Sequence, residues 1–305
     1  MVGPSHKKAA VSHIVGKRIC SVRRACRYVG MPRSTYDYLP KPAPPHQEQL
    51  HQRIVALSWA HPRYGYRRIR VLLGREGWMV SRKHVQHIRR QEGLKVRPKP
   101  KKMPRRGLST GLPTQATHRH HVWTWDFIFD RTDKGGTLKM MTLLDEYTRQ
   151  SLAIQVERQL TASEVLAVLE KAMARYGVPG YIRSDNGPEF IAAKVQQWLS
   201  ENQIKTIYID PGSPWQNGYI ESFHSRFRDE CLGREMFLNL REARVVISDW
   251  RLHYNQERPH SKLGYRSPNE FINTKTLTSL YLEIGCFFTD TTLILEVLWG
   301  RSFSS

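Results

Sequence analysis

Hydrophobic and polar positions follow two different periods along this chain. Between residues 122 and 156 apolar and polar side chains alternate, which predicts three successive strands. These strands cover residues 122–130, 138–144 and 151–156. Gly135 and Gly136 supply the turn between the first two strands. Apolar residues at helical spacing then predict a helix over 162–176, for which Thr161 is a suitable N-cap.

Short strands and helices alternate after this helix. The pattern predicts a strand over 181–183, a helix near 190–199, a strand over 206–209 and a helix from about Asn217. Three meandering strands followed by this alternation predict an α/β fold with a five-stranded mixed sheet and flanking helices. The order of elements matches the ribonuclease-H-like fold.

Residues before 121 predict only helices. Small and apolar residues on either side of Gly30 are typical of a helix-turn-helix over 22–38, which is either a DNA-contacting motif or an ordinary helical hairpin. A second helical unit follows, in which Gly77 ends one helix and Ser81 and Gly93 cap the next. The predicted apolar positions of its first helix are Leu50, Ile54, Leu57 and Trp59.

Charge divides the chain at the same place as the hydrophobic pattern. Of a formal net charge of +21, residues 1–120 hold 27 Lys and Arg against 4 Asp and Glu, whereas residues 121–305 hold 21 against 23. The strongly basic N-terminal part (residues 1–120), called the front below, indicates a polyanionic partner, and nucleic acid is the leading candidate. A basic ribosome-like protein or a membrane-surface tail is the alternative, which the ordered apolar patterns in the front disfavour. Four scattered cysteines and the lack of an apolar leader predict a cytoplasmic protein without membrane association.

These patterns divide the chain into six expected segments. They are a helix-turn-helix-like segment (1–40), a basic helical DNA-binding domain (46–94), a basic proline-rich linker (95–117), an α/β core (118–235), a C-terminal helix and cap of that core (236–272), and an apolar, acidic tail (273–305). The front is thus expected to be a small all-α, helix-turn-helix-type DNA-binding region. The candidates for contact with the DNA backbone are Arg67, Arg68, Lys101, Lys102, Arg105 and Arg106, together with Arg82, Lys83, Arg89 and Arg90, which are expected on the exposed face of the helix that Ser81 caps.

Three carboxylates occupy positions where this fold can bring them together. Asp126 lies in the middle of the first predicted strand, where an acid is costly unless it is paired or bound to metal. Asp185 ends the next apolar strand, and Glu221 lies one turn into the last predicted helix. We expect these three acids to be both the metal ligands and the catalytic residues of one site.

Such a cluster of acids would repel itself without cations. Hard oxygen ligands suit Mg²⁺ or Mn²⁺, and we expect two ions. Two ions about 4 Å apart can activate an attacking oxygen and stabilise the leaving oxygen of a displacement at phosphorus. No Ser/His/Asp arrangement in the sequence competes convincingly with this chemistry.

The motifs around these acids resemble a known family. Trp125-Asp126, the run SDNGPEF over 184–190 and the run SPWQNGYIESF over 213–223 resemble the DDE integrase core of bacterial insertion-sequence transposases. The front motif YGYRR over 64–68 and the motif HYNQERPH over 253–260 are similar to the downstream-frame (OrfB) product of the insertion-sequence-three family. The resemblance covers about residues 15–272.

This resemblance implies an activity and partners. It implies a retroviral-integrase-like recombinase that cleaves one strand at the element's ends and transfers the freed 3′-hydroxyl to another phosphodiester, with Asp126, Asp185 and Glu221 as the triad. Arg228, seven residues after the glutamate, is implied to contact the transposon end. The implied partners are terminal-repeat and target DNA, a second copy of the chain on that DNA, and the upstream-frame product, all in the bacterial nucleoid.

Further candidates and one alternative stay open. His224, one turn after Glu221, could approach a phosphate, and Asn217 is expected on the same polar helix face. Trp215 belongs either to a mobile loop that touches DNA or to a plain connector. The alternative function is a catalytically silent DNA-binding regulator of a full-length fusion transposase.

Overall fold

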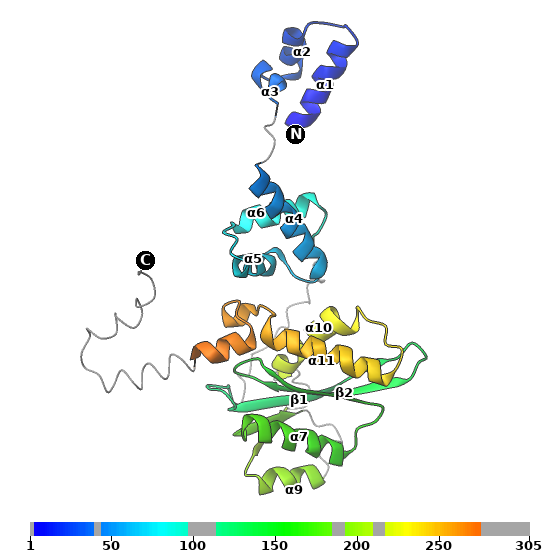
Figure 1. Ribbon diagram of the computed structural model, residues 1–305, viewed down its shortest axis with the longest axis vertical. Helices are drawn as coiled ribbons and strands as arrows, with labels where there is room; N and C mark the ends of the chain where they lie inside the picture. Colours follow the sequence, from blue (N-terminus) through cyan, green and yellow to red (C-terminus); the bar gives the residue numbers. More distant parts are fainter. Residues whose placement is uncertain (1–2, 40–43, 97–113, 185–192, 210–216, 276–305) are drawn as a thin grey trace, which may run out of the picture. The chain divides into compact units, whose positions relative to one another are not determined.

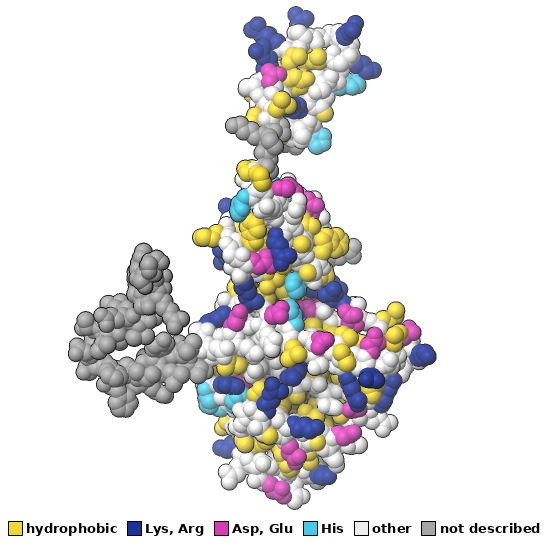
Figure 2. Space-filling view, in the orientation of Figure 1, with side chains coloured by type: hydrophobic (Ala, Val, Ile, Leu, Met, Phe, Trp, Pro, Cys, Tyr) yellow, Lys and Arg dark blue, Asp and Glu magenta, His cyan; other side chains and the backbone are white. Residues whose placement is uncertain are grey.

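The computed structural model describes residues 3–39, 44–96, 114–184, 193–209 and 217–275. The chain divides into two units, Met1–Ala56 and Leu57–Ser305. Figure 2 shows Lys and Arg side chains spread over the first unit with few acidic side chains among them, whereas both signs mix on the surface of the second. The uneven charge of the sequence is therefore also visible on the folded surface.

The first unit begins with three short helices around a small core (Figure 1). They are α1 (Pro4–Gly16), α2 (Val22–Val29) and α3 (Arg33–Asp37), and their buried residues are Val11, Ala25, Cys26 and Met31. Gly30 ends α2 with a φ of +63°, a left-handed conformation that favours glycine. The two helices predicted around this glycine are confirmed, whereas α1 was not predicted.

Three helices carry the second helical region. They are α4 (Pro45–Ala60), α5 (Tyr66–Arg75) and α6 (Arg82–Gln91). The Ser81 hydroxyl accepts the His84 N–H, so the predicted cap of α6 is confirmed. Leu50, Ile54 and Leu57 are buried as expected, but Trp59 is 68% exposed. The prediction for Trp59 is wrong because two helical steps rotate a side chain by about 200°, to the opposite face.

A five-stranded sheet organises the second unit. The strands are β1 (Val122–Arg131), β2 (Thr137–Asp145), β3 (Ser151–Glu157), β4 (Tyr181–Ser184) and β5 (Lys205–Tyr208), in the spatial order β3-β2-β1-β4-β5. The first three strands pair antiparallel, and β4 and β5 are parallel to β1. The mixed sheet predicted from the hydrophobic pattern, with the strand order of the ribonuclease-H-like fold, is confirmed.

Helices cover both faces of this sheet (Figure 1). One face packs on α7 (Ala162–Tyr176) and α9 (Ala193–Glu201) through a core that includes Trp123 and Trp125. The other face packs on α10 (Gly218–Phe227) and α11 (Leu240–Gln256). Thr161 and Glu164 form a capping box at the start of α7, as the sequence indicated for Thr161.

The opposite burial of neighbouring side chains in β1 follows from the strand period of two. Trp123 and Trp125 enter the core under α7, while Ile128 enters the core under α10. Even-numbered positions of β1 therefore face α10, and Asp126 is one of them. No helix among the residues that the structure describes is long and apolar enough to cross a membrane.

Candidate active site

The Asp126 carboxylate lies on the α10 side of the sheet and is partly open to solvent, with a side-chain exposure of 24%. Its Oδ1 atom accepts the N–H of Phe127 at 2.7 Å, and its backbone carbonyl accepts the Thr142 hydroxyl of β2 at 3.0 Å. These contacts fix the carboxylate on the central strand of the sheet.

Two side chains of α10 attach that helix to the strands around Asp126. The Asn217 Oδ1 atom, directly before the helix, accepts the Thr124 hydroxyl at 3.1 Å. One turn after Glu221, the His224 Nε2 atom lies 2.7 Å from the Thr142 hydroxyl, and His224 Nδ1 lies 3.7 Å from Asp126 Oδ2. Residues three and four apart share a helix face. Glu221 therefore shares the helix face of Asn217 and His224.

The hydrogen bonds indicate which ring nitrogen of His224 carries the proton. The single Thr142 hydrogen is donated to the Asp126 carbonyl, so Thr142 Oγ1 accepts a hydrogen from His224 Nε2. In the neutral ring, Nδ1 then presents a lone pair toward Asp126. Burial, and secondarily the charge of Arg228, lower the pKa of His224 from 6.5 to about 4, which keeps the ring neutral at pH 7.

Glu221 and Arg228 differ from these anchoring residues because both are exposed to solvent. Arg228 begins a π-helical turn, η2 (Arg228–Leu232), that continues α10. Such turns occur often at functional sites. Exposure leaves both side chains accessible to a ligand, as their predicted roles require.

The structure adds a role for Asn217 to the predicted polar helix face. The side chain is only 6% exposed and holds Thr124. Its position at the N-terminus of α10 turns it toward β1. Asn217 is thus placed to position the helix.

The end of β4 lies beside the Asp126 segment of β1. The two strands are parallel, and Thr124 pairs with Arg183. Asp126 lies two residues beyond Thr124, and Asp185 two residues beyond Arg183. Asp185 and Trp215 lie outside the described residues, so their predicted roles stay predictions.

A buried ion pair lies directly under the end of β4, and the sequence analysis did not identify it. Arg183 Nε lies 3.1 Å from Glu146 Oε1, and both side chains are fully buried. Arg183 also donates to the Thr114 carbonyl at 2.5 Å. Burial raises the pKa of Glu146 to about 7, although Arg183 and Arg149 act in the opposite direction. A charged arginine inside a short apolar strand is the sequence signal that could have revealed this pair.

The predicted DNA-contacting cations differ in their exposure to solvent. Arg67, Arg82, Lys83 and Arg90 are exposed, which their predicted role requires. Arg89 is only 4% exposed and donates to the carbonyls of Tyr64 and Leu94, so its expected place on the exposed face is wrong. Arg68 is partly buried and donates to the Pro259 carbonyl. The remaining candidates, Lys101, Lys102, Arg105 and Arg106, lie outside the described residues.

Family comparisons match the same two regions of the chain. Two models described as integrase core domain match residues 116–214 and 202–268. A model described as HTH-like domain matches residues 45–102, which contain α4, α5 and α6. The helix-turn-helix expected over 22–38 lies outside that match and stays a prediction.

Similar proteins come from bacterial insertion elements. The chain is 38% identical over 275 residues to the uncharacterized 39.2 kDa protein of insertion element IS476 from Xanthomonas euvesicatoria, covering 88% of this chain and 78% of that protein. It is 39% identical over 257 residues to the uncharacterized 31.7 kDa protein of insertion element IS407 from Burkholderia multivorans, covering 82% and 90%.

A solved structure is similar to part of the chain. The catalytic core domain of HTLV-2 integrase in complex with magnesium is 18% identical to it, with a TM-score of 0.39, over 52% of this chain and 99% of that one. The relatives over most of the chain and the integrase core matches agree with the motifs read from the sequence. The chain belongs to the insertion-element transposases that carry an integrase core and an HTH-like domain, as in the OrfB products of the insertion-sequence-three family.

Proposed function

We propose that this transposase cleaves a DNA strand at the ends of its insertion element and joins the freed 3′-hydroxyl to another strand. Asp126, Asp185 and Glu221 are the proposed catalytic residues. The observation that supports the proposal is the attachment of α10, the helix that carries Glu221, to the strands around Asp126 through Asn217 and His224. A buried hydrogen bond and a short contact to Thr142 are a firm basis for holding two acids in register.

Among the residues that the structure describes, no three His, Cys, Asp or Glu side chains gather closely enough to hold a metal ion, so the proposed site requires Asp185 to complete it. A carboxylate oxygen of Asp126 and the lone pair of the neutral His224 ring face each other at 3.7 Å, and two acceptors without a proton between them are a suitable pair for a metal. Asp126, Glu221 and Asp185 would hold the ions, Mg²⁺ or Mn²⁺, and we propose two. When bound, such ions supply Lewis acidity at the phosphoryl group.

The protein's own residues then bind and orient DNA. Arg228 is exposed at the end of α10 and is proposed to contact the transposon end. The exposed cations of α6, which are Arg82, Lys83 and Arg90, are proposed to hold the DNA backbone. Two DNA ends require a multimer of the chain, and the upstream-frame product is a further proposed partner.

Strand transfer in vitro tests this proposal. Linear DNA that carries the element's terminal sequences is incubated with the protein and Mg²⁺, beside Asp185→Asn and Glu221→Gln. We expect joined products with the unaltered chain and a loss of at least about a hundredfold in both variants, because each removes a metal-binding charge. Equal activity of the variants and the unaltered chain would overturn the triad.

The exposed basic face of α6 also favours a second function, a DNA-binding regulator without catalysis. The same assay separates the two functions. DNA binding without joined products, also after addition of the upstream-frame product, would identify the regulator.

A further inference from the structure

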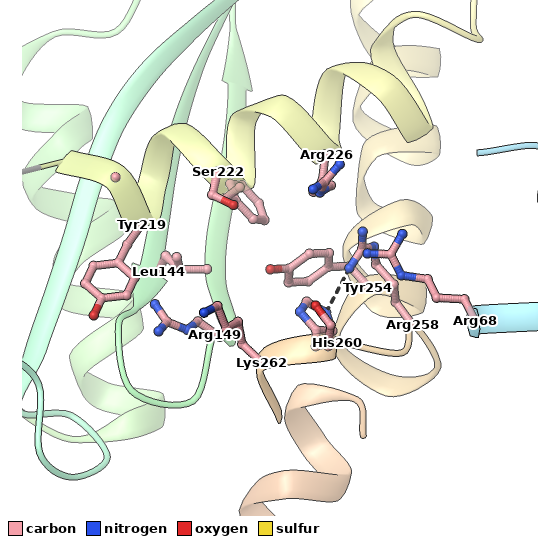
Figure 3. A pocket seen from close by; sticks show the side chains of 13 residues that line it. Arg68, Leu144, Arg149, Tyr219, Ser222, Arg226, Tyr254, Arg258, His260 and Lys262 are labelled. Carbon is pink, nitrogen blue, oxygen red and sulfur yellow. Dashed lines mark hydrogen bonds between the residues drawn. The ribbon is translucent and has the colours of Figure 1, made fainter. Parts of the chain in front are cut away.

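A cavity of about 330 Å³ opens beside α10 (Figure 3). Tyr219, Ser222 and Arg226 of the helix line it, at a spacing of three and four residues. Because successive helix residues differ by about 100° in direction, Ser222 points away from the Glu221 face although the two are neighbours. The cavity is therefore separate from the site around Asp126 but belongs to the same helix.

Cations dominate the wall of this cavity. Its five cationic side chains are Arg68, Arg149, Arg226, Arg258 and Lys262. They come from α5, the turn after β2, α10 and the segment after α11, so the tertiary fold alone brings them together. No acidic side chain lines the cavity in the described part of the chain, and Glu230, next to it, pairs with Arg258 and lies near Arg68.

Part of this charge is already neutralised. Arg258 donates to both carboxylate oxygens of Glu230 at 2.6 Å and is only 2% exposed. Arg68 lies 4.0 Å from the same carboxylate. Burial, with Arg258 and Arg226 nearby, lowers the pKa of Arg68 to about 10, which shows how closely the positive charges crowd. One carboxylate therefore serves two guanidinium groups.

The other cations remain available to a ligand. In the described part of the chain, no hydrogen bond or ion pair joins the side chain of Arg226 or of Lys262 to another residue. Arg149 lies over the Tyr219 ring, with Cζ 3.9 Å from the ring centroid, which orients its guanidinium at the cavity wall. Figure 3 shows the Tyr254 hydroxyl pointing into the space between these groups.

Like charges that a rigid fold holds together are destabilising until an anion enters. Guanidinium groups are well matched to phosphate because they donate two parallel hydrogen bonds, and hydroxyls such as Ser222 and Tyr254 add neutral donors. The nearest phosphates in the proposed function are those of the strand processed at Glu221, on the neighbouring face of α10. The cavity is too small for a duplex and large enough for one phosphodiester with its sugar.

The geometry points to this cavity as a second DNA site, which binds a phosphodiester of a strand that flanks the reacting one, with Arg226, Lys262 and Arg149 as its direct ligands. This inference rests on the proposed function only in taking DNA as the source of the phosphate. It assigns a role to the HYNQERPH segment, which supplies Arg258 and Tyr254, and to Arg68 of the YGYRR segment.

The salt dependence of DNA binding tests the inference. We compare the full chain with Arg226→Gln/Lys262→Gln, measuring fluorescence anisotropy of a short labelled duplex of arbitrary sequence over a series of salt concentrations. Each lost phosphate contact lowers the slope of log affinity against log salt by about 0.9. We expect the double variant to lose about 1 to 2 in slope and about tenfold in affinity at moderate salt.

A matched control removes the same charge on the other face of the sheet. Lys171→Gln/Arg175→Gln alters two exposed cations of α7, and we expect it to retain the slope of the unaltered chain. Equal slopes in all three proteins, or equal losses in both variants, would overturn the site. Lys262→Gln alone, at an exposed position, repeats the test if the double variant does not fold.

Two further arms identify the source of the phosphate and separate this inference from the proposed function. If inorganic pyrophosphate raises the melting temperature of the unaltered chain and not of the double variant, while DNA slopes are unchanged, the cavity binds free phosphate and the DNA assignment fails. If the double variant shows a lower slope of log affinity against log salt, DNA binding in the cavity is supported even when no strand transfer is found. If strand transfer is found but the salt dependence of DNA binding is the same in the double variant and the unaltered chain, the proposed function stands and the cavity is not a DNA site.

Discussion

Acidic side chains lie on one flank of α10, near Glu221, and cationic side chains on the other, around the cavity. The two flanks stabilise their like charges in different ways. On one flank Glu221 is exposed and Asp126 partly exposed, so water can solvate the carboxylates. On the other flank Arg258 is buried and requires the paired carboxylate of Glu230. Removing a carboxylate should therefore affect chemistry on the first flank and folding on the second.

Glu230→Gln should have the largest effect on stability. It removes the charge that Arg258 faces at two 2.6 Å contacts, and breaking a buried pair costs about 3–5 kcal/mol in the free energy of unfolding. Denaturant unfolding measures this loss. Glu235→Gln, at an exposed position in the same segment, and Glu221→Gln should change stability little. A loss as large in Glu221→Gln as in Glu230→Gln would remove the contrast between the flanks.

The part of the sheet that carries Asp126 also contains a buried ion pair, Glu146 with Arg183. Glu146→Gln therefore tests whether a buried carboxylate affects stability there as well. The folded-state pKa of Glu146 is raised from 4.5 to about 7, so between these values the folded chain keeps a proton that the unfolded chain has lost. The stability that this proton supplies is present below about pH 4.5 and is lost as pH rises to about 7, by up to about 3 kcal/mol.

The glutamine variant mimics the protonated form and lacks this loss. Its stability relative to the unaltered chain should therefore rise between pH 5 and pH 7.5, which thermal unfolding at several pH values measures. Glu170→Gln, on the exposed face of α7, is the control and should show no such trend. A constant difference across this pH range would show that Glu146 is ionised throughout.

Thr142→Val should have a smaller effect on stability than Glu230→Gln or Glu146→Gln and a specific effect on activity. The hydroxyl contacts both the Asp126 carbonyl and His224, and its removal leaves buried polar groups without partners, at about 1–2 kcal/mol. Loss of such a supporting contact typically lowers activity about 10–100-fold. Strand transfer of Thr142→Val is compared with that of Thr137→Val, at an exposed position on the same strand. Equal activities would show that His224 needs no anchor.

The strands and helices of the fold could be predicted from local sequence. The apolar period of two in strands and of 3.6 in helices directly reflects which side chains are buried. The predicted strands of β1, β2 and β3 differ from the observed bounds by at most one residue. The burial of Arg89 could not be predicted in this way, because the helical period places this residue on the exposed basic face of its helix. The carbonyls of Tyr64 and Leu94 that it binds belong to other segments, which a helical pattern does not contain.

The predicted site was recoverable in part for the same reason. The predicted positions of Asp126 in a strand and of Glu221 near the start of a helix are confirmed, but the anchors Thr142 and Asn217 were not assigned their roles. Their partners are 82 and 93 residues away in the chain. A polar residue in a strand or before a helix is common, and only its distant partner distinguishes it.

By itself the sequence determined the order of strands and helices, the division into a basic front and a neutral core, and the acids of the candidate site, because these depend on neighbouring residues and on motifs. Only the tertiary structure decided which charges meet. Arg68 and Glu230 are more than 160 residues apart in the sequence, yet they lie 4.0 Å apart beside a cavity on α10. Contact between charges depends on distance in space, and the folded sheet and helices set that distance.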